Sequence, residues 1–142
     1  MMEKMTTAEA CAFLSHGMRT GKLATVRADG RPHVVPVWFL LDGDELVFTT
    51  WHTSVKAAHL QRDGRIALCV DNENLPYDFV LVEGTATISE DVDDLRLWAT
   101  KIAARYMGEA QAEAYGRRNG VPGEWLVRAK ITHIVGQKEV AL

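Results

Sequence analysis

Residues 31–70 read RPHVVPVWFLLDGDELVFTTWHTSVKAAHLQRDGRIALCV and carry the strongest strand pattern in the chain. Apolar side chains alternate with polar or outward-facing positions along 32–41 and again along 45–50. A period of two predicts strands, and the DGD sequence between the two segments predicts a tight turn. The stretch therefore predicts a hairpin followed by further short elements, in which Pro36 indicates an edge, a bulge or a site where another group approaches the backbone.

The flanking sequence extends this strand-rich pattern. Thr6 and Glu9 form a capping box for an opening helix, and Thr53 or Ser54 can cap a second helix. The predicted elements are, in order, the helix after Thr6, strands at 22–27, 32–41 and 45–50, a helix ending near Arg62, strands at 66–70 and 79–88, helical segments at 92–106 and on to Arg118, and a strand at 125–134.

About six short strands, mostly joined by tight turns, with helices inserted late in the chain, favour a small antiparallel barrel over alternating βαβ units. We expect an α+β fold that is mainly β, closed or partly closed, and organised as a single domain over residues 1–142. At 142 residues and 47% hydrophobic content, the chain can fill one core.

Composition excludes several classes of partner. Nineteen acidic residues against sixteen Lys and Arg give a net charge of −3, which lacks the basic footprint of a nucleic-acid binder. No segment offers the ~20 apolar residues that a membrane span requires. We therefore expect a soluble, cytoplasmic protein that binds neither nucleic acid nor membrane.

Familiar catalytic patterns are missing from the sequence. The serines lie in no nucleophile elbow, and the five histidines lack the spacing of three or four residues typical of a metal clamp. The acidic clusters belong to a turn and to a helix start, where carboxylates serve structure. We assign no catalytic residue and no metal ligand.

One cluster can bind an anion. Thr49 and Thr50 end a strand, and Ser54 and Lys56 begin the next helix, so that hydroxyls, free backbone N–H groups and an ammonium surround one point. This arrangement fits a phosphate. Spacing alone supports equally an interpretation in which Ser54 only caps the helix and Lys56 points into water.

The order of these motifs resembles that of the pyridoxamine 5′-phosphate oxidase-like split β-barrel flavoproteins. The motifs are a strand beginning Gly-x-Pro, a strand ending Phe-x-Thr, a Ser-x-Lys at the next helix and a buried strand after Asp-x-Arg. Here they are Gly30–Pro32, Phe48–Thr50, Ser54–Lys56 and Asp63–Val70, and the later VEGTATI at 82–88 suits the next strand.

The resemblance implies a fold, a site and an assembly. It implies that the cofactor phosphate is held by Thr49, Thr50, Ser54 and Lys56. It implies that the cofactor ring lies along the second strand, at Val35, Pro36, Val37 and Trp38. It also implies a homodimer with two cofactors at the interface, in which the segment from Tyr77 to Phe79 of the partner subunit packs against the cofactor ring.

Two departures indicate which cofactor is used. Val35 and Leu40 stand where the pyridoxamine phosphate oxidases have an arginine and a lysine, and the chain ends KEVAL rather than in a basic, proline-containing segment. The stretch LATVRADGRPHVVPVWFLLDG at 23–43 is more similar to the branch that uses the deazaflavin coenzyme F420. That branch transfers a hydride between the reduced deazaflavin and an unsaturated or quinone-like small molecule, which requires no protein nucleophile.

Three functions share this expected fold. The first is an F420-dependent oxidoreductase, the second an FMN-dependent oxidoreductase, and the third a cofactor-binding or haem-binding carrier without turnover. Trp38, Trp51 and Tyr77 are candidates for substrate walls, and they suit core positions equally.

Overall fold

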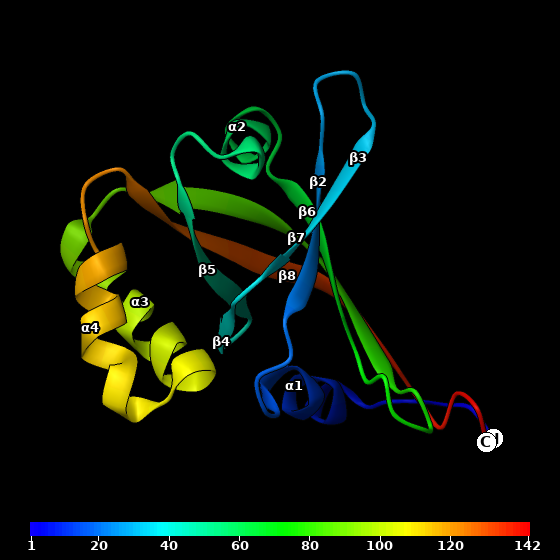
Figure 1. The fold of residues 1–142 in the computed structure, drawn as a ribbon. Coiled ribbons are helices and arrows are strands. Elements are labelled where there is room, and N and C mark those ends of the chain that lie inside the picture. The colour runs from blue at the N-terminus through cyan, green and yellow to red at the C-terminus, as the bar shows by residue number, and fades with distance from the viewer.

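Eight antiparallel strands form one twisted sheet in the computed structural model, which describes residues 1–142 (Figure 1). The strand order is β3-β2-β6-β7-β8-β5-β4, and the short β1 pairs with β8. The strands are β1 (Glu3–Lys4), β2 (Gly21–Val26), β3 (Pro32–Val37), β4 (Leu40–Asp42), β5 (Glu45–Trp51), β6 (Arg65–Asp71), β7 (Phe79–Ser89) and β8 (Glu124–Lys138), and the helices are α1 (Thr7–Ser15), α2 (Val55–Arg62), α3 (Val92–Met107) and α4 (Glu109–Asn119).

The two edges of this sheet are consecutive in the chain. β3 pairs only with β2, β4 pairs only with β5, and Trp38 and Phe39 carry the chain from one edge to the other. The sheet therefore curls towards closure, and its edges are joined by the chain and by no ladder of hydrogen bonds. The predicted α+β, mainly β, split-barrel class is confirmed.

The prediction of one continuous strand at 32–41 is wrong, because the segment forms the two strands β3 and β4, and the sheet has eight strands where about six were expected. The backbone N–H and carbonyl of Phe39 form hydrogen bonds with side chains of α3, where a strand residue would bond to a neighbouring strand. Its N–H donates to the Tyr106 hydroxyl at 3.3 Å, and its carbonyl accepts from Arg105 Nη1 at 2.8 Å. The strand breaks because these contacts, distant in sequence, satisfy the backbone of Phe39 in place of a neighbouring strand.

Pro36 lies in an edge strand, as its missing N–H requires. The last strand is longer than the predicted segment 125–134 and continues to Lys138, where it pairs with the start of β7 and with β1. A register shift between Glu83 and Gly84 marks a bulge in the β7–β8 pair.

The helices begin at the side chains that the sequence indicates. Thr6 accepts from the N–H of Glu9 at 3.1 Å, and the Glu9 carboxylate accepts from the N–H of Thr6 at 3.0 Å, which completes the capping box. Asp91 accepts from two N–H groups in the first turn of α3. Gly108, with φ of 91°, separates α3 from α4 in a backbone conformation that glycine adopts without strain.

Two apolar clusters hold the fold together. The larger has fifteen buried residues and fills the space inside the curled sheet beneath α1 and α2. The smaller joins the other face of β5 and β8 to α3, through Val47, Leu126, Leu95 and Trp98.

Figure 1 shows α3 and α4 together on one side of the sheet, with α2 beside the β2–β3 hairpin and both termini at the opposite end from that hairpin. None of the helices has both the length and the apolar composition needed to cross a membrane.

Candidate cofactor site

A cavity of about 350 Å³ lies where the split in the sheet meets α2 and the α3–α4 pair. Such a volume lies within the range of ligand pockets. Five of its lining residues are among those that the sequence predicts to bind a cofactor, and they come from β3, the β3–β4 link, β5 and α2. They are Pro36, Val37, Trp38, Thr49 and Lys56.

Lys56 supplies the positive charge of this cavity. Its ammonium makes no hydrogen bond and no ion pair within the chain, although its side chain is half removed from water. Burial lowers the pKa of Lys56, and the nearby Glu124 carboxylate opposes that shift. Glu124 shows the reciprocal behaviour, since burial raises its pKa and Lys56 opposes the rise. An anion in the cavity would give the Lys56 ammonium the partner that it lacks.

Thr49 and Thr50 lie on opposite faces of β5, because side chains alternate along a strand. Thr49 lines the cavity, whereas Thr50 is buried at 2% exposure. The Thr50 hydroxyl lies 2.7 Å from that of Ser54, and the Ser54 hydroxyl accepts from the N–H of Ala57 at 3.1 Å. Thr50 and Ser54 therefore hold the start of α2 in place from outside the cavity, and Thr49 is the threonine that lines the cavity.

The first turn of α2 retains anion-binding capacity even though Ser54 caps it. The Ser54 side chain and carbonyl serve the N–H groups of Ala57 and Ala58. The N–H groups of Val55 and Lys56 have no acceptor within the chain. Ser54 can therefore cap the helix while the same helix start binds an anion. The cap satisfies some of the backbone N–H groups that lack a partner at a helix N-terminus and leaves the others available to a ligand.

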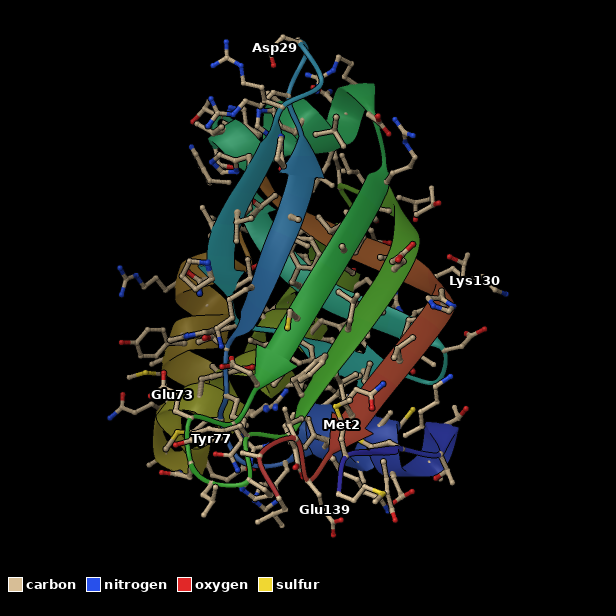
Figure 2. The ribbon with its side chains drawn as sticks, turned by 90° about the vertical axis from the view of Figure 1, so that its right-hand side faces the viewer. Met2, Asp29, Glu73, Tyr77, Lys130 and Glu139 are labelled. Carbon is tan, nitrogen blue, oxygen red and sulfur yellow. The ribbon has the colours of Figure 1, made fainter.

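The remaining predicted residues lie apart from this cavity. The Val35 side chain packs against the main core, so that only its backbone faces the edge of the sheet. Phe79 starts β7 and pairs with Asp71 and Gln137, at the far end of the sheet. Figure 2 shows the neighbouring Tyr77 at that end, opposite Asp29 at the tip of the β2–β3 hairpin. The predicted roles of all nine residues stay predictions.

Trp38 is the aromatic wall of the cavity. Its indole is 37% exposed and stacks on Tyr106, with ring centroids 5.1 Å apart and an interplanar angle of 3°. The Tyr106 hydroxyl donates to the carbonyl of Arg19 at 2.9 Å, and burial raises its pKa. Trp51 and Tyr77, the other two candidates for substrate walls, do not line this cavity.

Sequence reasoning missed half of the lining. The other five residues come from the loop before β2, from one face of α3 and from the end of α4: Thr20, Ala99, Ile102, Ala103 and Asn119. The spacing of 99, 102 and 103 does indicate one helix face, and the small size of Ala99 and Ala103 could have indicated a space against it. Nothing in the sequence marks Asn119, because α4 reaches the cavity only through its packing on α3.

The lining suits a planar, anionic cofactor. Apolar and aromatic groups of β3 and α3 form the walls, whereas Lys56, two free N–H groups and the Thr49 hydroxyl gather near the start of α2. A ring system with a phosphate can place its apolar body against the walls and its charge at this helix start.

The chain matches known proteins along most of its length. The model of the pyridoxamine 5′-phosphate oxidase family matches residues 6–137. The F420H(2)-dependent biliverdin reductase of Mycobacterium tuberculosis is 35% identical over 101 residues, which cover 69% of this chain and 70% of that protein.

Solved structures agree with this match. A conserved hypothetical protein of Mycobacterium tuberculosis superposes with a TM-score of 0.82 at 26% identity, covering 97% of this chain and 89% of the other. A structure described as an F420 reductase superposes with a TM-score of 0.69 at 26% identity, covering 87% and 94%. The chain therefore belongs to the pyridoxamine 5′-phosphate oxidase family of oxidoreductases.

Proposed function

We propose that this protein is an F420-dependent oxidoreductase that reduces an unsaturated or quinone-like small molecule. The observation that carries the proposal is the cavity, because it collects Pro36, Val37, Trp38, Thr49 and Lys56 from three separate segments of the chain. The similarity to an F420H(2)-dependent biliverdin reductase and to an F420 reductase supports the deazaflavin over FMN.

The residues of the chain would bind and orient the cofactor. Lys56, with the free N–H groups at the start of α2, would hold the phosphate, and Thr50 and Ser54 would keep that helix start in place. Trp38 and the backbone of β3 would lie against the ring, with Tyr106 fixing the indole from behind. When bound, the reduced deazaflavin supplies a hydride, so the protein contributes orientation and exclusion of water and needs no nucleophile.

We further propose that the working form is a homodimer with the cofactor at the interface. Large apolar side chains are exposed on the edge strand and on the β6–β7 loop. They include Val34 at 61% exposure, Leu75 at 64% and Tyr77 at 47%. A partner subunit would cover them and bring its own Tyr77–Phe79 segment towards the ring. Sedimentation equilibrium should give twice the mass of the chain, and a monomer at all concentrations would contradict the proposed assembly.

The test of the cofactor is a fluorescence titration of the purified protein with F420 and with FMN, each repeated for Lys56→Met. Loss of the charge-assisted contact should weaken F420 binding by about 1.5–3 kcal/mol, which is roughly 10-fold to 150-fold in Kd. Lys130→Met is the matched control, because Lys130 is an exposed lysine of β8 away from the cavity (Figure 2). Preference for FMN, or equal affinity in both variants, would contradict the proposal.

The test of turnover follows oxidation of the reduced deazaflavin in the presence of biliverdin, an enone and a quinone. Biliverdin is the first acceptor to try, because the 35% identical relative is a biliverdin reductase. We expect oxidation with at least one acceptor. Tight binding without oxidation would identify a carrier of the cofactor in place of an enzyme.

A further inference from the structure

A second cavity, of about 500 Å³, lies between α2 and the β2–β3 hairpin and shares no lining residue with the cofactor cavity. Figure 2 shows Asp29, one of its lining residues, at the hairpin tip at one end of the molecule. Its lining is rich in basic and imidazole groups and consists of Arg27, Ala28, Asp29, His33, Val55 and His59.

Two histidines form the floor of this second cavity. His59 is 8% exposed, and its Nδ1 lies 2.9 Å from the Thr25 hydroxyl. The His33 ring stands edge-on to the His59 ring, with centroids 5.1 Å apart and planes at 83°. His33 Nδ1 is buried and has no hydrogen-bond partner, and His59 Nε2 makes no hydrogen bond. A buried nitrogen without a partner costs about 1–3 kcal/mol, so that the pair is poised to gain a contact.

Positive charge converges on this pair, and the nearby Asp63 carboxylate, next to Arg62 in the chain, is already paired with Arg65. Neither Arg27 nor Arg62 has a carboxylate partner, and Arg62 donates to the carbonyl of Val26. The acid in the lining, Asp29, is already engaged by Arg31, whose backbone and side chain both bind its carboxylate. The pKa of His59 is lowered first by burial and then by the charges of His33, Arg62 and Arg27.

A metal ion does not fit this cavity. A cation would need a third ligand besides the two imidazoles, and no group of three His, Cys, Asp or Glu side chains converges anywhere in the chain. Two arginines would also repel it. Guanidinium groups instead match the oxygens of phosphate and carboxylate groups, with which they form paired hydrogen bonds.

We propose that the cavity between α2 and the β2–β3 hairpin is a second anion-binding site, which takes a phosphate or carboxylate group between Arg27 and the His33–His59 pair. Arg62 adds positive potential from the last turn of α2 and keeps its hydrogen bond to Val26. The bound oxyanion balances the charge of the arginines and accepts a hydrogen bond from an imidazole. Its affinity increases as the pH falls, since an anion favours the protonated imidazole.

The test is a titration with inorganic phosphate, observed through the imidazole signals of the five histidines by NMR at constant ionic strength. We expect saturable shifts for His33 and His59, with tighter binding at about pH 6 than at about pH 8. Arg27→Gln should weaken phosphate binding on the order of tenfold. Arg117→Gln, at an exposed arginine of α4 that lines neither cavity, is the control and should leave the affinity unchanged.

Two further measurements make the result decisive. In the Lys56→Met background, which removes the cationic side chain of the other cavity, phosphate should raise the Tm, and the increase should be smaller when Arg27→Gln is added but not when Arg117→Gln is added. Lys56→Met should keep the shifts of His33 and His59, because Lys56 belongs to the other cavity. Shifts that never saturate, or equal affinity in the two arginine variants, would overturn the proposal.

The source of the anion can be separated in the same experiment. A phosphate response that persists when the protein is saturated with F420 indicates a free anion as the ligand. A response that F420 abolishes indicates that an anionic group of the coenzyme itself occupies the site. The phosphate titration of the protein alone does not depend on F420 binding, so failure of the second site and failure of the proposed function are distinguishable.

Discussion

The indole of Trp38 lies parallel to the ring of Tyr106, with centroids 5.1 Å apart. The pair joins the link between the two edge strands to the last turns of α3 and forms one wall of the cofactor cavity. The same Tyr106 also binds backbone groups of Phe39 and Arg19 through its hydroxyl. The Tyr106 side chain thus holds the Trp38 indole and the backbone of both Arg19 and Phe39.

Tyr106→Phe should lower the free energy of unfolding by about 1–2 kcal/mol. The substitution keeps the stacked ring and removes the hydroxyl, which leaves the half-buried Arg19 carbonyl and Phe39 N–H without a partner. Urea unfolding measures the change. Tyr115→Phe on α4 is the control, because the Tyr115 hydroxyl makes no hydrogen bond, and equal effects of the two variants would contradict the assigned role.

Arg105→Met should destabilise the protein by about 3 kcal/mol or more. The guanidinium donates to three carbonyls, those of Leu14, Gly17 and Phe39, at 2.7–2.8 Å, and no carboxylate is paired with it. Methionine keeps much of the apolar stem, removes the donor of the Leu14 and Gly17 carbonyls and leaves the Phe39 carbonyl only the longer bond from the Tyr106 hydroxyl at 3.4 Å. Thermal and urea unfolding should separate this variant from Arg117→Met, whose exposed side chain makes one weak ion pair, with an expected change below about 0.5 kcal/mol.

Ala99→Leu should fill part of the cofactor cavity and reduce affinity for F420 by at least about tenfold. Ala99 lies on the face of α3 that lines the cavity, so the added atoms would occupy space that the ligand needs. The fluorescence titration measures the loss. Ala110→Leu adds the same atoms at an exposed position of α4 and should leave the affinity unchanged.

Glu9 should contribute to the acid sensitivity of the fold. Its pKa in the folded chain is about 2, against 4.5 ordinarily, because Lys138 donates to its carboxylate at 2.6 Å and the N–H of Thr6 donates as well. The folded pKa is the lower one, so its stabilisation is present above about pH 4.5 and is lost as the pH falls towards 2. Urea midpoints of wild type and Glu9→Gln should therefore differ at neutral pH and converge near pH 2.

Lys138→Met is the control for that interaction, since it removes the main cause of the low pKa of Glu9. Its midpoints should show the same reduced dependence on pH as those of Glu9→Gln, and the double variant should add little to either. A difference between wild type and Glu9→Gln that is constant with pH would show that Glu9 acts through its cap alone.

Local patterns in the sequence determined the helix starts and most strand positions. Thr6 with Glu9 caps the helix that it was expected to cap, Ser54 is the one of the two candidates Thr53 and Ser54 that caps α2, and the acidic cluster at 91–94 lies at the start of α3 as expected. Such signals act over a few residues, so they can be read from the chain directly. The order of the motifs also indicated the family.

Only the tertiary structure decided where the barrel splits and what closes the cofactor cavity. The break at Phe39 depends on Arg105, 66 residues further along the chain, and the carboxylate that acts on the charge of Lys56 is that of Glu124, on the distant strand β8. The second cavity likewise depends on His59 reaching Thr25 across 34 residues. Contacts of this kind are set by how the sheet curls and how α3 and α4 pack on it, because burial and electrostatic shifts arise from neighbours in space and not from neighbours in sequence.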